Sequence, residues 1–174
     1  MDSEKIIIRV ANKNDAEVIA DISRETFYDS FASYNTEENM NKFMNRQFTK
    51  EKLMAEVDTP GNIFLMAYIN NELAGYVRMT ENDNPKELGN ADAMEIVRIY
   101  SVQKKIGKGV GKALMQYCID IAKQKEKKLI WLGVWEHNKR AIAFYTKWGF
   151  EKFSEHIFLL GDEQQTDWMM KKML

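Results

Sequence analysis

Three glycines at alternate positions, Gly107, Gly109 and Gly111, constrain this chain more than any other part of its sequence. They follow a β-branched, apolar stretch at 95–102 that predicts a strand, and apolar residues recur at helical spacing from Val110 onwards. Glycine lets the backbone turn sharply and approach a ligand, and the first turn of a helix offers unpaired N–H groups. The loop therefore predicts a site for a phosphate-bearing ligand, although a plain tight turn is the alternative if the loop is taken alone.

Two other kinds of nucleotide site fit this loop less well. A P-loop needs Ser or Thr after its lysine to hold magnesium, whereas Lys112 is followed by Ala113. A dinucleotide-binding fold takes the spacing G-x-G-x-x-G, whereas this loop has G-x-G-x-G and too little chain after it for a six-stranded parallel sheet. Glu136 closes the next strand where a ribose-binding acid would lie, so a dinucleotide-dependent oxidoreductase ranks second among the enzyme classes.

The size and charge of the chain limit the number of domains and the classes of partner that we expect. It has 174 residues, with 25 Lys and Arg against 26 Asp and Glu, and a formal net charge of −1. We expect one domain over residues 1–174 and no nucleic-acid partner. No apolar run approaches the roughly 20 residues that cross a bilayer, and the first residues lack the layout of a secretory signal. We therefore expect a cytosolic protein with no membrane partner.

Cysteine and histidine give no sign of a metal centre. Cys118 is the only cysteine, so neither an intramolecular disulfide nor a Cys cluster is available. It falls on the apolar stripe of an expected helix, which predicts a buried structural thiol. His137 and His156 lack metal-ligand spacing, so we assign no metal and give neither histidine a role.

Hydrophobic periodicity and turn residues predict a mixed α/β domain in the order strand, helices, three strands, helix, strand, helix, two strands. Asn12 and Thr36 are expected helix caps, and Asn70 and Asn71 are an expected hairpin turn because Asn tolerates positive φ. The expected strands are 5–10, 62–69, 73–80, 93–102, 129–135, 150–160 and 166–173. The expected helices follow Asn12, Thr36, Thr49 and Gly109, and the last covers 138–148.

Asn138 and Tyr145 are seven residues apart on one expected helix, which places their side chains on the same face. If this helix lies beside the glycine loop, Asn138 can hydrogen-bond an amide of the ligand while the Tyr145 hydroxyl reaches a reacting atom. The alternative is that Asn138 only caps the helix, which we favour for that residue alone, and that Tyr145 only fills the core.

These combined motifs resemble the GNAT superfamily of acetyl-CoA-dependent N-acetyltransferases. The motifs are Glu95–Tyr100, Gly107–Leu114, Asn138–Ala141 and Tyr145–Phe150. The resemblance implies a central, mostly antiparallel twisted sheet of about six to seven strands flanked by about four to five helices. Further motifs are Glu25–Phe27 with Asp29 and Phe31, Ile130–Glu136, and Gly161–Glu163 with Gln165–Asp167. They carry a narrower resemblance to the PaiA-type polyamine acetyltransferases, which implies acetylation of spermidine or spermine.

The resemblance also implies which residues bind acetyl-CoA as cosubstrate. The pantetheine arm would exchange main-chain hydrogen bonds with the strand edge at 99–101, and the pyrophosphate would lie on the loop amides. Family members usually have Arg or Gln before the first loop glycine, where this chain has Ile106; we expect binding to survive, with Lys104 or Lys105 as a substitute charge. The implied coenzyme residues are Ile99, Tyr100, Ser101, Ile106, Gly107, Lys108, Gly109, Val110, Gly111, Lys112, Asn138, Tyr145 and Lys147.

The chemistry needs a base, because an alkylamine is mostly protonated at neutral pH and must lose a proton before it attacks. Glu95 is the candidate base, directly or through water, and strand alternation places it on the face of Val97 and Ile99. The alternative is that Glu95 simply binds the cationic substrate. Tyr145 is the candidate acid for the leaving thiolate, and the amine attacks directly with no acetyl-enzyme intermediate.

The expected acceptor is a primary amine of a small cation, with a polyamine as the first candidate. Carboxylates and aromatic rings would recognise it, although packing and solvated surface are the alternative for each of them. The expected acceptor residues are Phe27, Tyr28, Asp29, Glu37 and Glu95, with Glu38 beside them. The alternatives are a non-catalytic acetyl-CoA sensor and an acetyltransferase for peptide N-termini or another small amine. Strand edges and N-terminal aromatics are compatible with a homodimer.

Overall fold

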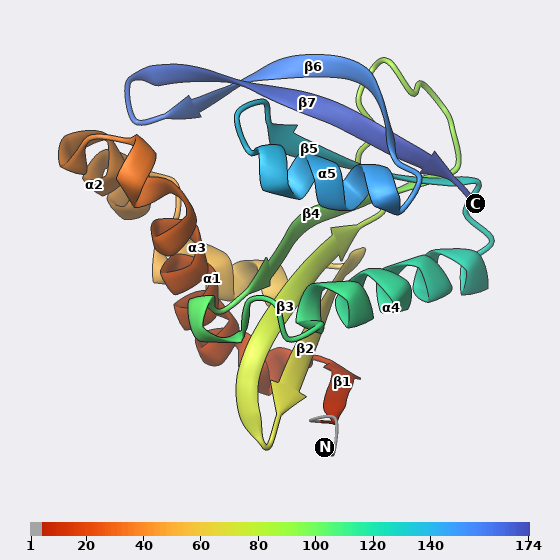
Figure 1. Cartoon of the computed structure of the whole chain (residues 1–174), viewed down its shortest axis with the longest axis horizontal. Helices are drawn as coiled ribbons and strands as arrows, with labels where there is room; N and C mark the ends of the chain where they lie inside the picture. The colour runs from red at the N-terminus through yellow and green to blue at the C-terminus, as the bar shows by residue number, and fades with distance from the viewer. Residues whose placement is uncertain (1–4) are drawn as a thin grey trace.

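The computed structural model describes residues 5–174, and one seven-stranded sheet with five α-helices runs through this part of the chain (Figure 1). The strands are β1 (Ile6–Val10), β2 (Asn62–Ile69), β3 (Glu72–Thr80), β4 (Ala93–Ser101), β5 (Leu129–Trp135), β6 (Glu151–Leu160) and β7 (Glu163–Met173). The α-helices are α1 (Ala16–Phe31), α2 (Glu37–Arg46), α3 (Lys50–Val57), α4 (Val110–Gln124) and α5 (Lys139–Lys147). The expected fold class and element order are confirmed.

Three short 3₁₀ helices, η1 (Lys13–Asp15), η2 (Ala32–Tyr34) and η3 (Gln103–Lys105), are not predicted from the sequence. β7 also begins earlier than the expected Thr166. Gly161, with φ of 63°, and Asp162 close a two-residue turn, so β6 and β7 pair up to Leu160 and Glu163.

Local polar signals set the ends of the elements as expected. Asn12 forms a capping box with Asp15 at the start of η1, and the Asn39 N–H donates to Thr36 Oγ1 at 3.2 Å at the start of α2. Asn70 and Asn71 take φ of 51° and 65°, which turns β2 into β3. These three sequence predictions are confirmed.

The sheet order is β1-β2-β3-β4-β5-β7-β6, and every neighbouring pair is antiparallel except β4 and β5. That parallel pairing covers only Ala93–Ile96 against Leu129–Leu132. Beyond it β4 stays paired with β3, and β5 stays paired with β7. We call the unpaired stretches 97–101 of β4 and 133–135 of β5 the β4/β5 opening, because here two neighbouring strands leave their facing edges free.

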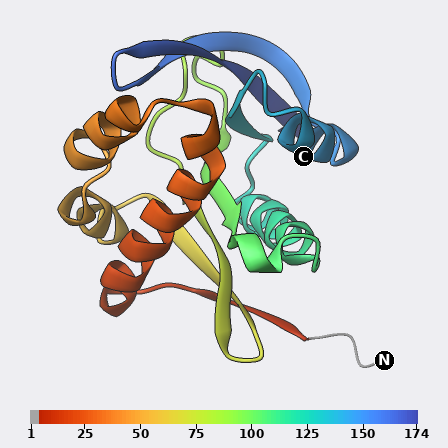
Figure 2. The same cartoon turned by 60° about the vertical axis from the view of Figure 1, so that its left-hand side comes forward.

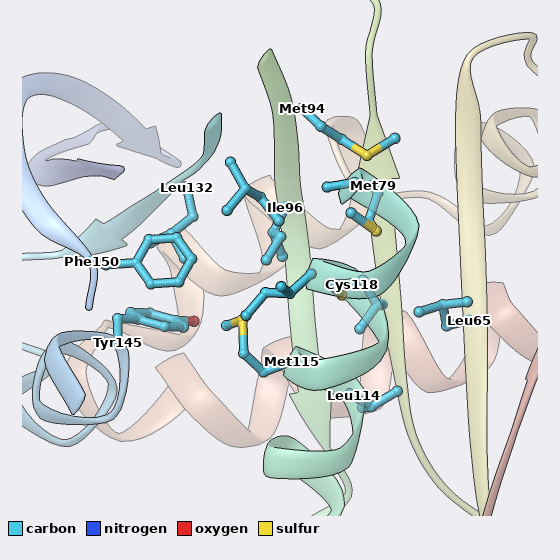
Figure 3. Close-up of a cluster of buried hydrophobic side chains, with 14 of the residues drawn as sticks. Leu65, Met79, Met94, Ile96, Leu114, Met115, Cys118, Leu132, Tyr145 and Phe150 are labelled. Carbon is cyan, nitrogen blue, oxygen red and sulfur yellow. The ribbon is translucent and has the colours of Figure 1, made fainter. Parts of the chain in front are cut away.

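Helices cover both faces of the sheet. Figure 2 shows α1, α2 and α3 on one side of the strands and α4 with α5 on the other. The main core lies on the α4 and α5 face, where Met79, Ile96 and Leu132 pack with Met115 and Cys118 (Figure 3). Cys118 is fully buried, as the sequence predicts, and burial raises the pKa of its thiol.

A β-bulge at Val97 changes which side chains of β4 share a face. Arg98 pairs with Arg78 and Ile96 with Met79, so Val97 has no partner on β3. Ile96 and Ile99 therefore both pack in the main core, while Glu95, opposite Thr80, lies on the other face with Arg98. The expectation that Glu95 shares a face with Ile99 is wrong, because the extra residue shifts the alternation by one position.

Partly buried charged side chains link α3 to the strands on the α1–α3 face. Glu56 of α3 accepts a hydrogen bond from Arg78 Nη1 at 2.9 Å and another from Arg98 Nη2. The Arg98 guanidinium also lies 5.3 Å from the centre of the Phe48 ring. One carboxylate thus compensates two arginines of β3 and β4 beside the opening.

We predict that Glu56→Gln lowers the free energy of unfolding by about 2–3 kcal/mol, below the range for a fully buried pair because Glu56 is partly exposed. The loss arises because both arginines stay inside without their counter-charge. Urea denaturation measures it, and Glu51→Gln on the exposed side of the same helix is the control, with a change within about 0.5 kcal/mol. Equal losses in the two variants would contradict this role of Glu56.

Candidate active site

The glycine loop leads directly into the first turn of α4. Gly107 and Gly109 take φ of 86° and 85°, a left-handed conformation that other residues adopt only with strain, and Gly109 is the N-cap of α4. The first intrahelical bond runs from the Ala113 N–H to Gly109 O at 3.0 Å. The preceding N–H groups of the first turn are therefore available to an anion.

Only two of the three glycines are required by their backbone conformation. Gly111 lies inside the first turn of α4 with an ordinary helical backbone, and a methyl group there would meet Phe144 of α5 at 3.7 Å. A methyl group at Gly107 would meet nothing within 4 Å. The loop thus borders open space at Gly107 and borders α5 at Gly111.

Positive charge surrounds the loop. Lys104, Lys108 and Lys112 are exposed, whereas Lys105 donates to Glu72 Oε2 at 2.8 Å. The η3 turn places Lys104 and Lys105 one turn before the loop, and Ile106 is 41% exposed beside them. Lys104 and Lys105 are the candidates to replace the positive charge that Ile106 lacks. Lys105 is the weaker candidate, because Glu72 already neutralises part of its charge.

The edge of β4 that faces the opening holds the expected pantetheine residues. Ile99, Tyr100 and Ser101 pair with β3 on one side only, so the main-chain N–H and C=O groups of this stretch that point away from β3 face the opening. Ile99 packs towards α4, whereas the Tyr100 ring stacks on Tyr76 on the α1 face at 6.2 Å. A ligand can therefore add to this edge as a strand would.

Glu95 lies one residue before the last β4–β5 pair and opposite Trp131. Burial raises the pKa of Glu95 to about 7, with Arg78 opposing the shift and Asp83 adding to it. A carboxylate with that pKa is well matched to accepting a proton near neutral pH. Glu95 thus combines a raised pKa with a place on the α1–α3 face of the sheet, next to the β4/β5 opening.

Tyr145 lies in α5 and Asn138 is the N-cap of that helix, on the opposite face of the sheet. The Ala141 N–H donates to Asn138 Oδ1 at 3.1 Å, so Asn138 does cap the helix. Tyr145 is 8% exposed and lies beside Phe150, and Figure 3 shows its hydroxyl pointing towards Met115 of α4. Burial raises the pKa of the Tyr145 hydroxyl, which keeps it protonated as a donor.

The candidate base and the candidate acid therefore lie on opposite faces of the sheet. Glu95 belongs to the α1–α3 face, and Tyr145 belongs to the core under α4 and α5. The β4/β5 opening is where the sheet between them is interrupted. Lys147, another expected coenzyme residue, is exposed at the last position of α5.

The expected acceptor residues are not gathered in one place. Phe27 is buried and stacks on Phe43 at 4.5 Å, which favours the packing role that the sequence leaves open. Tyr28 is exposed, and Asp29 lines a cleft of about 540 Å³ between α1 and η3. Glu37 lines a groove on the outer side of α2, with Glu38 beside it. Of this group, only Glu95 lies at the β4/β5 opening.

Other side chains lie where the sheet opens on the α1–α3 face. Trp135 pairs with Asp167 of β7, and its ring meets the Tyr34 ring at 5.2 Å. His156 Nε2 lies 3.8 Å from Asp167 Oδ2. Sequence periodicity does not predict that Trp135, Asp167 and His156 lie together, because their proximity depends on the pairing register of β5, β6 and β7. The sequence signal that could have found them is the set of resemblance motifs that include Trp135 and Asp167.

Among residues 5–174, no group of three or more His, Cys, Asp or Glu is arranged to hold a metal ion. Within the same range, no helix is long and apolar enough to span a bilayer.

Comparison with known proteins identifies the family. The model of the acetyltransferase (GNAT) family matches residues 17–150. An uncharacterised N-acetyltransferase of Lactobacillus delbrueckii subsp. lactis is 40% identical over 168 residues, which cover 97% of this chain and 96% of that protein. The spermidine N(1)-acetyltransferase of Thermoplasma acidophilum is 27% identical over 171 residues, covering 96% of each protein.

Solved structures agree with the sequence comparison. The PaiA N-acetyltransferase of Thermoplasma acidophilum in complex with coenzyme A superposes with a TM-score of 0.78 at 25% identity, covering 98% of this chain and 99% of that one. The chain therefore belongs to the GNAT acetyltransferase family and is an N-acetyltransferase, a class of enzyme that uses acetyl-CoA as cosubstrate.

We predict that Gly107→Ala raises the Kd for coenzyme A about tenfold, because a methyl group would occupy the open side of the loop. Gly89→Ala is the matched control, since Gly89 also has positive φ and open space around it but lies in a distant loop. Both variants carry a similar backbone strain of about 1–2 kcal/mol, so only the loop position distinguishes them. Isothermal titration calorimetry measures the Kd, and an equal effect in both variants would contradict the loop's role.

Proposed function

We propose that this enzyme transfers the acetyl group of acetyl-CoA to a primary amine of a small cation by direct attack, with a polyamine as acceptor. The observation that carries the proposal is Glu95, a partly buried carboxylate with a pKa of about 7 at the end of the β4–β5 pairing. A non-catalytic acetyl-CoA sensor has no need of such a group. The family membership of the chain also favours an enzyme.

The coenzyme would approach from the α4 and α5 face. The N–H groups of the first turn of α4 and the two left-handed glycines would hold its pyrophosphate, with Lys108 and Lys112 adding positive charge. The free edge of β4 at 99–101 would bind the pantetheine arm. Asn138 would contribute its side-chain amide from the start of α5, and Lys147 would act from the end of that helix.

The amine would approach from the α1–α3 face and meet the thioester in the opening. Glu95 takes a proton from the ammonium group, and the neutral nitrogen attacks the thioester carbon. The N–C bond forms and the C–S bond breaks, so the electron pair leaves with the sulfur. Tyr145 donates a proton to this thiolate, and solvent returns that proton to the tyrosinate. The new amide nitrogen loses its second proton to solvent, and Glu95 later releases its own proton to solvent. A β4 N–H group at the opening can polarise the carbonyl oxygen.

The relatives support a polyamine among the amines that fit. A protein that is 27% identical over nearly the whole chain acts as a spermidine N(1)-acetyltransferase. The α1–α3 face at the opening also offers a carboxylate and aromatic rings, which suit a cation with an apolar chain. The cytosolic location and the homodimer stay predictions.

Release of free thiol from acetyl-CoA tests the proposal with a panel of polyamines, aminoglycosides, amino acids and peptide N-termini. We expect spermidine or spermine to give the highest kcat/KM. Turnover with peptides alone would show that the acceptor is a peptide N-terminus and not a polyamine. No turnover above the rate without acceptor would reject the enzyme mechanism.

We predict that kcat rises with pH and levels off above about 7, because Glu95 accepts a proton only when ionised. Glu95→Gln should remove this rise and lower kcat by roughly 10²- to 10⁴-fold. Asp83→Asn is the companion variant, since removing its negative charge should move the midpoint of the profile to lower pH. If Glu95→Gln keeps the rise and changes only KM, Glu95 binds the substrate instead.

We predict that Tyr145→Phe lowers kcat roughly tenfold or more while the Kd for acetyl-CoA changes within about twofold. The substitution removes the proton donor but keeps the ring packed beside Phe150. Tyr117→Phe on the exposed side of α4 is the control and should leave both quantities unchanged. Equal losses in turnover and coenzyme binding would make Tyr145 a binding residue.

A further inference from the structure

Asp167 is a largely buried carboxylate that the proposed reaction does not use. Its side chain is 18% exposed and lies on β7, opposite Trp135 of β5 and His156 of β6. Burial raises the pKa of Asp167, and the charge of His156 opposes that shift. Within residues 5–174, His156 is the one basic side chain with a nitrogen within 4 Å of it, at 3.8 Å. A carboxylate desolvated in this way gains most from a ligand that carries positive charge.

The residue next to Asp167 on the side of the opening is a glycine. Gly133 of β5 is exposed, and a methyl group there would lie 3.3 Å from His156 Cε1 and 3.7 Å from Asp167 Oδ2. Any larger residue at this position would cover the carboxylate from the side of the opening. Burial is the main cause of the raised pKa of Tyr100 on β4, and the negative charge of Asp167 adds to it.

Aromatic rings line the other side of this position. The Trp135 ring lies 5.2 Å from the Tyr34 ring and 6.2 Å from the Phe31 ring. These two contacts join β5 to η2 and to the end of α1. Gln165 Nε2 donates to Asn35 Oδ1 at 2.7 Å, so β7 is fixed to the same segment. Faces of aromatic rings attract cations and also pack against methylene groups.

Asp167 and Glu95 lie on the same face of the sheet at a useful separation. Glu95 is opposite Trp131, Asp167 is opposite Trp135, and these two tryptophans are four residues apart on β5. Four residues of strand span about 13 Å. Because β4 and β7 flank β5, two strand spacings of about 4.8 Å also separate the residues sideways, which gives roughly 16 Å between their backbone positions. A chain that places one amine at Glu95 can therefore present a second charge near Asp167 only if it is long.

We propose that Asp167 binds a second ammonium group of the acceptor and so makes the enzyme selective for long diamines and polyamines over monoamines. This inference rests on the proposed function. It assigns to β7 the recognition of the ammonium group that is not acetylated. The aromatic side chains of Trp135, which is opposite Asp167, and Tyr34 contact the methylene groups next to the distal ammonium. Asp29 and Glu37 on the helices, which the sequence suggests for this task, lie outside this path.

The test compares two acceptors of equal chain length in the steady state: spermidine, and a primary alkylamine with the same number of chain atoms and one charge. Asp167→Asn should raise KM at least tenfold for spermidine and leave the KM of the alkylamine within twofold. Asp167→Glu keeps the charge and should keep the preference for spermidine. Equal changes for both acceptors, or none for either, would overturn the proposal.

Two controls separate recognition from folding and from catalysis. Asp162→Asn removes an exposed carboxylate from the β6–β7 turn, where it pairs with Lys42, and should leave the KM of both acceptors unchanged. The thermal midpoint and the Kd for coenzyme A of Asp167→Asn should match the parent enzyme.

Calorimetric titration of spermidine into the complex with coenzyme A measures the same site without turnover. Loss of binding in Asp167→Asn supports the proposal even if another amine is the better acceptor, whereas unchanged binding overturns it. If the parent enzyme acetylates amines but Asp167→Asn shows no selective effect, this inference fails while the proposed function stands.

Discussion

The early end of the pairing between β4 and β5 is the constraint on which the rest of the site depends. Both strands continue past Ile96 and Leu132, but each keeps only its outer neighbour. A sheet normally separates what lies on its two faces, and here it is interrupted two residues beyond Glu95. A coenzyme that arrives on the α4 face and an amine that arrives on the α1 face can meet there without any movement of the sheet.

The remaining parts of the molecule place charge on each side of this interruption. On one face, the first turn of α4 and its lysines supply the positive field that suits a pyrophosphate. On the other, burial leaves Glu95 with a pKa near neutrality, and Arg78 stays paired with Glu56 while it limits that shift. The bulge at Val97 connects the two arrangements, because it turns Arg98 and Glu95 to one face and Ile99 to the other.

The features that the sequence predicts well are those set by neighbouring residues. The glycine loop, the caps at Asn12 and Thr36 and the Asn70–Asn71 turn depend on local backbone chemistry, and all are found as expected. The sequence prediction places Glu95 on the wrong face of the sheet, because the β-bulge at Val97 leaves no recognisable pattern in an apolar strand. The group around Asp167 is hidden because it forms only when β5, β6 and β7 pair in one register. Aromatic residues of α1 mislead for a related reason, since Phe27 looks like a ligand residue but packs against Phe43.

The most direct test of the account is a crystal structure with a bisubstrate analogue in which coenzyme A is joined to spermidine through an acetyl linker. We predict that the linker lies between 97–101 of β4 and 133–135 of β5, with the pyrophosphate on the first turn of α4 and the polyamine on the α1–α3 face. A linker on one face of the sheet, with both ends on the same side, would contradict the claim that the β4/β5 opening is where the two substrates meet.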